Sequence, residues 1–301
     1  MTTKKFSTFE YAAFAEPGEP GAAGVHCQDV FETPMGHAFV VVADENATQE
    51  GAELCEVALQ RIRYYMEHEP DEEEKNVTEN ALIYTSGYVF QHYNKDKSEP
   101  LIGLSCLCVL FVDGRIYYSW VGDVGLYLFT GKQQYWLTCP DPKKSGNDTV
   151  EKTATKELPL LGQQAIIKPF SNGDAPLKPI NGDKLMLTSG SVGKQIHTKA
   201  TKRILKDSMP LKTKVNRILR EVDPADQSGA LIILRFHAVD NKVRSITANA
   251  KTPATVQAPK AEVVSGEKTG KTHQKKQMPY LQIALWVLGF LAVAYFVYDL
   301  F

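Results

Sequence analysis

Six short runs in the first 239 residues are rich in valine, isoleucine, leucine, tyrosine and phenylalanine, and they end at glycine, aspartate or asparagine. Such runs are typical of β-strands, because β-branched and aromatic side chains suit a pleated surface. Asp113-Gly114 separates two of them and predicts a tight hairpin, since a type I′ turn requires positive φ at both central residues. We therefore expect antiparallel strands at residues 37–43, 105–112, 115–121, 125–129, 183–188 and 230–237.

Apolar residues recur at helical spacing in four other segments. The first two, residues 50–67 and 77–93, interrupt the strands, and the other two, residues 199–207 and 213–222, precede the last strand. The order is therefore strands, a helix pair, more strands, a second helix pair and a final strand. This order predicts an α+β fold in which helices pack on antiparallel sheets, with residues 1–239 as one domain.

The hydrophobic pattern changes at the end of the sequence. From Leu281 to Tyr298, Gln282 is the only strongly polar side chain. About 20 apolar residues, each rising about 1.5 Å, cross the hydrocarbon layer of a membrane, so residues 280–301 predict one transmembrane helix. A buried helix of a soluble core is the alternative, although such a helix is usually shorter and carries a polar stripe.

The charges beside this segment predict how the protein lies in the membrane. Four lysines precede it closely and no basic residue follows it, so the positive-inside rule places residues 1–279 in the cytoplasm. The N-terminal sequence lacks the continuous apolar stretch of a signal peptide. Residues 240–279 have no phenylalanine, tyrosine or tryptophan and no sustained period, which predicts a flexible tether. We therefore expect a single-pass protein with a cytoplasmic domain at 1–239 and a membrane anchor at 280–301.

Composition excludes two classes of protein. The 301 residues are 43% hydrophobic and 23% charged, which excludes a chain that is disordered throughout. The net charge is only −1, so the chain has no global positive field that would gather nucleic acid. Residues 240–301 hold eight basic and four acidic residues, a net +4, which leaves −5 for residues 1–239. The five cysteines fit neither a disulfide framework nor a zinc knuckle, which favours a reducing compartment.

Four aspartates fall beside predicted strands, where the chemistry of such a domain is expected. Asp29 precedes a strand, Asp44 ends one, Asp123 follows another and Asp226 precedes the last. Carboxylates that crowd together raise the free energy unless a hard cation neutralises them, so a metal site is one explanation. For any one of these aspartates taken alone, a role in a turn or a helix cap is the better explanation.

Several short segments, in this order along the chain, resemble motifs of the metal-dependent protein phosphatase family, also called the type 2C-like or PPM family. VGDVGLYLF at 121–129 is similar to the family's V-G-D-S-R-x-Y-L, and NGDKLMLTSG at 181–190 is similar to G-D-x-L-L-L-x-S-D-G. Further motifs match CQDVFE at 27–32, VVVADENATQEG at 40–51 and ADQSGALIIL at 225–234. The shared order of short motifs over more than 200 positions argues against a chance match.

The resemblance implies a central β-sandwich of two antiparallel sheets flanked by helices, with a two-metal site at one end. It also implies manganese or magnesium as the metal, and hydrolysis of phosphoserine and phosphothreonine by a metal-bound hydroxide. Carried over residue by residue, it implies metal ligation by Asp44, by the backbone of Glu45 and by Asp226. It further implies that Asp123 binds a third ion and that Asp29 orders a metal-bound water.

Departures from the family motifs predict a weakened site. Ser189 stands where the family has a metal-ligand aspartate, so a neutral hydroxyl replaces a charged ligand for a hard cation. Gly24 stands in place of the phosphate-binding arginine, for which the neighbouring His26 substitutes only in part. Residues 46–49 lack the glycines and the histidine that could protonate the leaving group. Gly193 replaces a further aspartate.

These losses predict a pseudophosphatase, because we expect each one to reduce the rate about tenfold or more, at about 1.4 kcal/mol per factor of ten. We expect a membrane-anchored protein that binds a phosphorylated protein or regulates a kinase. A slow metal-dependent serine/threonine phosphatase that keeps Asp44, Asp226 and Asp123 is the alternative. A purely structural scaffold is the third possibility.

Overall fold

The structure of the protein, a computed structural model, describes residues 2–5, 8–16, 25–44, 50–68, 73–95, 102–131, 133–138, 158–196, 199–221 and 229–237. The chain divides into two units, Met1–Asn249 and Ala250–Phe301, and every described residue belongs to the first. Within these stretches no helix is long and apolar enough to cross a membrane. The predicted membrane span at 280–301 and the predicted tether at 240–279 lie outside the described residues.

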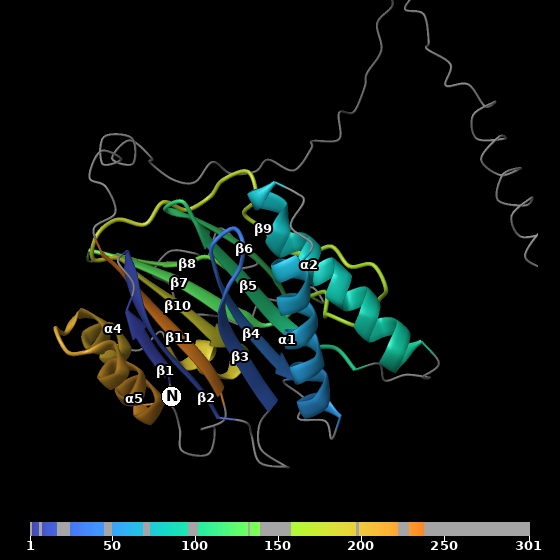
Figure 1. The fold of residues 1–301 in the computed structure, drawn as a ribbon. Helices are drawn as coiled ribbons and strands as arrows, with labels where there is room; N and C mark the ends of the chain where they lie inside the picture. Colours follow the sequence, from blue (N-terminus) through green and yellow to red (C-terminus); the bar gives the residue numbers. More distant parts are fainter. Residues whose placement is uncertain are drawn as a thin grey trace, which may run out of the picture. The chain divides into compact units, whose positions relative to one another are not determined.

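Among the described residues, six strands form an antiparallel sheet, sheet A, in the order β1-β2-β11-β10-β7-β8. They are β1 (Thr2–Lys5), β2 (Phe9–Glu16), β7 (Val124–Thr130), β8 (Gln133–Trp136), β10 (Lys184–Ser189) and β11 (Gly229–Phe236). Although β11 comes last in the described chain, it lies between β2 and β10 in the middle of the sheet (Figure 1).

Sheet B contains five strands of the described chain in the order β3-β4-β5-β6-β9. They are β3 (Val25–Glu32), β4 (His37–Asp44), β5 (Ser105–Val112), β6 (Arg115–Val121) and β9 (Phe170–Ser171). In the turn between β5 and β6, Asp113 has φ 47° and Gly114 has φ 73°. Both central residues therefore have the positive φ that the sequence predicts for this hairpin.

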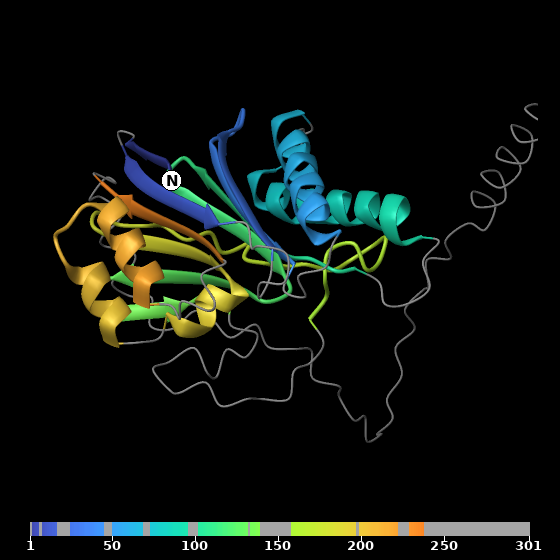
Figure 2. The same ribbon diagram turned by 90° about the horizontal axis from the view of Figure 1, so that it is seen from below.

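Helices cover the outer face of each sheet (Figures 1 and 2). The helices on sheet B are α1 (Gly51–His68) and α2 (Glu74–Val89), and α2 continues into a short π-helix, η1 (Phe90–Asn94). The helices on sheet A are α3 (Gly190–Gln195), α4 (Lys199–Lys206) and α5 (Leu211–Glu221). Three apolar clusters fill the spaces between the four layers, so the two sheets form a sandwich with helices on both sides.

The alternation of side chains along β4 explains how sheet B is buried on both faces. Phe39 and Val41 pack between the two sheets, whereas Val40 and Val42 pack beneath α1 and α2. All four side chains are 0% exposed. Burial of one such side chain stabilises the fold by about 1.5–3 kcal/mol, so β4 is fixed strongly between two cores.

The sequence prediction of an α+β fold with antiparallel sheets and packed helices is confirmed. The predicted strands at 105–112 and 115–121 match β5 and β6, and the four predicted helices are present with shifted ends. The prediction misses β1, β2, β3, β8, β9 and α3. It also places Asp29 before a strand, and this is wrong, because Asp29 lies within β3.

Candidate functional site

The turn from β6 to β7 joins the two sheets at one end of the sandwich. In sheet B, antiparallel pairing brings the end of β4 beside the start of β5, which lies next to the end of β6. In sheet A, the end of β10 lies between the start of β7 and the start of β11. The predicted site residues Asp44, Asp123 and Ser189 therefore lie at strand ends around this turn. Together with Ser105 and His26, which lie beside them, they form the group that we call the candidate site.

Asp123 lies in the turn and is tied to sheet B through its backbone. Its N–H donates a hydrogen bond to Ser105 Oγ at 3.0 Å. Ser105 in turn pairs with Ala43, the residue before Asp44. Gly122, which precedes Asp123, has φ 70°, and a Cβ there would lie 2.4 Å from Ser105 Oγ. Only glycine fits this turn without a shift of the chain, so the approach of Asp123 to the end of β4 depends on it.

The carboxylate of Asp123 lies against the start of α3. A Cβ on Gly190 would be 2.7 Å from Asp123 Cγ and 2.8 Å from Oδ2. A side chain at position 190 would therefore displace this carboxylate. Because Ser189 directly precedes Gly190, the structure brings Asp123 close to Ser189.

Ser189 ends β10, and its side chain is 0% exposed. Its hydroxyl oxygen accepts a hydrogen bond from the backbone N–H of Ala230 in β11 at 3.2 Å. A buried neutral hydroxyl with this partner is satisfied. A carboxylate in the same place would be a buried charge, which requires a nearby cation or several strong donors.

Asp44 and His26 are neighbours on paired strands, since Asp44 pairs with Val25 and His26 pairs with Ala43. Both side chains are buried, at 1% exposure each. Burial lowers the pKa of His26 to about 4, against the opposing effect of the Asp44 charge. The imidazole is therefore neutral at pH 7. Within the described part of the chain, neither of its ring nitrogens has a hydrogen-bond partner.

Asp29 lies apart from these residues. It pairs with Val40, four residues along β4 from Asp44, which corresponds to about 13 Å of strand. Its Oδ2 accepts a hydrogen bond from Nη1 of Arg63 on α1 at 3.2 Å, and the two side chains are partly exposed. The structure therefore places Asp29 in an ion pair beside α1 and does not bring it to Asp44.

Two predicted ligands lie outside the described residues. Glu45 directly follows β4, and Asp226 lies three residues before the start of β11. Both are therefore attached to strand ends that belong to the candidate site. Gly193, the position of a further lost aspartate, lies on α3, and its carbonyl accepts a hydrogen bond from the Tyr127 hydroxyl at 3.2 Å.

The described residues do not fit a two-ion centre by themselves. They contribute two carboxylates, two hydroxyls that accept backbone hydrogen bonds, and a neutral imidazole at the candidate site. Among them, no group of three or more histidine, cysteine, aspartate or glutamate side chains could hold a metal ion. Manganese and magnesium bind several oxygen ligands, usually including carboxylates. Glu45 and Asp226 would have to complete any ion site.

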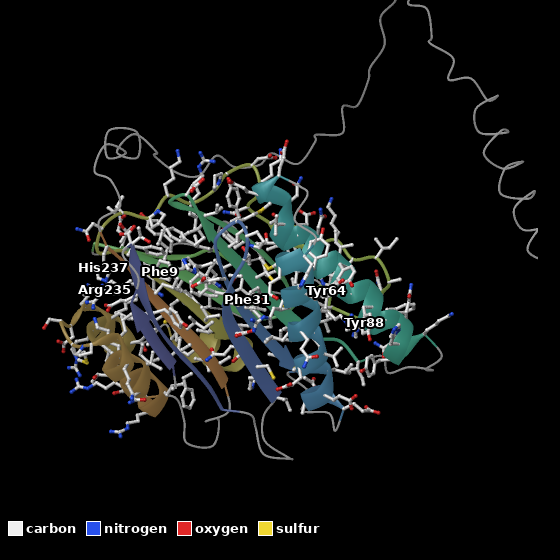
Figure 3. All side chains as sticks on the ribbon, in the orientation of Figure 1. Phe9, Phe31, Tyr64, Tyr88, Arg235 and His237 are labelled. Carbon is white, nitrogen blue, oxygen red and sulfur yellow. The ribbon has the colours of Figure 1, made fainter. Side chains whose placement is uncertain are left out.

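Two polar clusters lie away from the candidate site. Glu10 pairs with Arg235 and, at 3.6 Å, with His237, at the opposite end of β11 from Gly229 (Figure 3). Where α1 and α2 pack together, Arg61 Cζ lies 3.8 Å from the centre of the Tyr88 ring on α2. Both clusters connect neighbouring elements and supply no group to the candidate site.

Sequence reasoning misses two residues that hold the predicted acids in place. Ser105 binds the backbone of Asp123, and Arg63 binds the carboxylate of Asp29. Each is far from its partner along the chain, and neither stands in a motif. Only the pairing of β4 with β5 and the packing of α1 on β3 identify them.

Solved structures of several phosphatases have the same fold, a sandwich of two antiparallel sheets between helix layers. A bacterial serine phosphatase matches with a TM-score of 0.60 and 14% identity, over 76% of this chain and 98% of that chain. The Staphylococcus aureus serine/threonine phosphatase Stp1 matches with a TM-score of 0.59 and 13% identity, over 75% and 94%. The catalytic domain of the serine/threonine protein phosphatase PstP, solved in complex with two manganese ions, matches with a TM-score of 0.57 and 13% identity, over 76% and 99%.

These likenesses show the fold: the chain has the fold of the PPM-type serine/threonine phosphatases, as the sequence motifs predict. At this level of identity they show nothing further about activity. No protein-family model matches the chain. No curated protein matches it at a significant level.

Proposed function

We propose that the protein is a pseudophosphatase that is held at a membrane by residues 280–301 and that acts by binding a phosphorylated protein or by regulating a kinase. The PPM-type fold, the Asp44 carboxylate at the end of β4 and the Asp123 carboxylate in the turn after β6 support a relation to phosphatases. The loss of activity is inferred from two replaced groups, the metal-ligand carboxylate at position 189 and the phosphate-binding arginine at position 24. The proposal predicts recognition without efficient turnover.

The observation that carries this proposal is the state of Ser189. The resemblance assigns this position to a carboxylate that ligates metal, whereas the Ser189 hydroxyl is fully buried and bonded to the Ala230 amide. A hydroxyl that is used as a strand-to-strand acceptor contributes no charge to offset a divalent cation. The ion affinity of the site would therefore depend on Asp44, Asp123 and residues outside the described chain.

The chemistry of His26 supports the same proposal. A phosphate-binding arginine holds the dianion with two parallel charge-assisted hydrogen bonds. The buried His26 imidazole, with a pKa of about 4, is neutral and offers at most one hydrogen-bond donor at a time. Phosphate would therefore be held weakly at this position, which disfavours efficient hydrolysis.

The test is a turnover assay of the full chain in detergent, with manganese or magnesium, on phosphoserine peptides and on p-nitrophenyl phosphate. We expect no turnover above that of the matched variant Asp44→Asn, which removes the charge and keeps the shape. Rates typical of enzymes, about 1–1,000 per second, that disappear in Asp44→Asn would contradict the proposal.

A slow metal-dependent serine/threonine phosphatase remains the second candidate, because Asp44 and Asp123 retain two carboxylates at the candidate site. Calorimetric titration distinguishes the two. If neither manganese nor magnesium binds the full chain at millimolar concentration, the enzyme is excluded. If an Asp44→Ala chain keeps unchanged partner binding, a purely structural scaffold is favoured over both.

A further inference from the structure

Four of the cysteines lie close together on the helix-facing side of sheet B. Cys27 on β3 pairs with Val42, and Val42 pairs with Cys106 on β5, so these residues form a row across three strands. Cys108 lies two residues beyond Cys106 and faces the same way. Cys55 packs over this face from α1. All four thiols are free.

Cys27 and Cys55 are neighbours where α1 packs on β3. Each thiol shifts the pKa of the other: Cys55, as a hydrogen-bond partner, lowers the pKa of Cys27, and the pKa of Cys55 is raised first by Cys27 and then by burial. The Cys55 sulfur also lies 3.7 Å from the carbonyl oxygen of Val25, which is two residues from Cys27 on the same face of β3. Cys55 is therefore held against β3 at two neighbouring positions.

Exposure separates Cys27 from the other three cysteines of this group. Cys27 is partly exposed, whereas Cys55, Cys106 and Cys108 are 0% exposed. Cys27 and Cys106 are two strand spacings apart, about 9.6 Å, which is beyond the range in which a disulfide can form. Of these four cysteines, Cys27 is therefore the most accessible to a small oxidant, and Cys55 is the one best placed to react with it next.

We propose that Cys27 and Cys55 form a redox-modification site, in which a peroxide oxidises Cys27 and Cys55 then closes a disulfide between β3 and α1. In the first step the Cys27 sulfur attacks one peroxide oxygen and the O–O bond breaks. Cys27 becomes a sulfenic acid, and the departing hydroxide takes up the thiol proton as water. In the second step the Cys55 sulfur attacks Cys27, the S–O bond breaks, and hydroxide leaves with the Cys55 proton as a second water.

The two steps balance, since two thiols lose two electrons in total and one peroxide is reduced to two waters. Closing the disulfide brings these two neighbouring sulfurs to a bond of about 2 Å. The bond would join α1 to the strand that pairs with the end of β4, because Val25 lies opposite Asp44. In a reducing compartment such a disulfide is transient, as redox-sensing disulfides are.

The experiment treats the reduced full chain with hydrogen peroxide, alkylates the remaining thiols and maps the peptides by mass spectrometry. We expect a dithiothreitol-sensitive cross-link between Cys27 and Cys55, and loss of both thiols from the alkylated pool, while Cys106 and Cys108 stay alkylated. In Cys55→Ser, the same treatment should leave a sulfenic acid at Cys27 that a dimedone reagent traps. Cys108→Ser is the matched control and should still form the cross-link.

Two results would overturn the proposal. One is a folded, peroxide-treated wild-type chain in which Cys27 and Cys55 both remain alkylated. The other is oxidation of Cys106 or Cys108 at the same rate as Cys27. Both results come from the wild-type chain, so they decide the question even if a serine variant fails to fold.

Discussion

At the scale of single residues, the candidate site combines groups whose states are set by burial. Ser189 and His26 are both buried, yet the hydroxyl is satisfied by Ala230, and the imidazole has no hydrogen-bond partner within the described stretches. An imidazole in such a place avoids its charge, because the folded protein cannot solvate it. The state of His26 therefore couples the stability of the fold to pH.

The low pKa of His26 predicts loss of stability in mild acid. The ordinary pKa of 6.5 applies to the unfolded chain and about 4 to the folded chain, so between these values the unfolded chain binds more protons. Above pH 6.5, the contribution of His26 to the free energy of unfolding is present in full. As the pH falls toward 4, this contribution decreases by up to about 3 kcal/mol. Urea unfolding across this window measures the loss, and His26→Gln should reduce it.

The control for this prediction is His68→Gln, which removes an exposed imidazole at the end of α1. A wild-type profile that runs parallel to the His26→Gln profile throughout the window would contradict the assignment. The comparison subtracts the free energy of unfolding of one variant from that of another at each pH. The effects of other groups that titrate in acid therefore cancel.

At the scale of elements, the hairpin of β3 and β4 decides which residues reach the candidate site. Its turn is closed by a hydrogen bond from the Thr33 N–H to the Gly36 carbonyl at 2.7 Å and one in the reverse direction at 3.2 Å. This turn sets the register that pairs Val25 with Asp44 and leaves Asp29 farther along the strand. The position of one turn thus separates Asp29 from the other acids.

Gly36 fixes this turn against β5, and its replacement should be costly. A Cβ at this position would lie 2.2 Å from the Phe111 carbonyl oxygen, a backbone atom that no rotamer change can move. We expect Gly36→Ala to lower the free energy of unfolding by about 1–3 kcal/mol, measured by urea titration. Gly173→Ala is the control, since its nearest atom would be 3.3 Å away. Equal losses in the two variants would contradict the steric explanation.

The hydrophobic pattern predicts some elements of this fold well and others poorly. β5 and β6 are predicted to the residue because both are apolar and Asp113-Gly114 marks their turn. β3 is missed because its side chains from Cys27 to Val30 are only partly buried and include Gln28 and Asp29. Partial burial gives a weak alternation, so the pattern does not distinguish such a strand from a loop.

The same limit applies to the candidate site. The motifs place Asp123 and Ser189 at the ends of two well-marked strands, and the structure brings these two strand ends together. Contacts between a helix and a strand, such as Cys27 with Cys55, depend on how α1 packs over sheet B. The periodicity of side chains within one segment does not predict which residues of a second segment it contacts. Cys27 and Cys55 belong to different elements, so the sequence pattern does not predict their contact.

At the scale of the whole molecule, the proposed membrane anchor remains a prediction from the sequence. We expect the full chain to stay with membranes after an alkaline carbonate wash, and a chain without residues 280–301 to be released. Deletion of residues 246–267, which removes an equal length of the tether, is the matched control and should leave the protein membrane-bound. Release of the full chain by the wash would exclude a spanning helix.

The central place of β11 has a consequence for the time at which the candidate site forms. This strand pairs Phe236 with Phe9 and Gly229 with Glu16, so contacts across more than 200 residues of chain complete sheet A. Closure of such long loops slows folding, because the entropy of the intervening chain is lost before the contact is gained. Ser189 cannot meet Ala230 until this last strand has been synthesised and inserted. The contact that holds the Ser189 hydroxyl therefore depends on the last strand of the described chain, whereas the pairing of β4, β5 and β6 beside Asp44 does not.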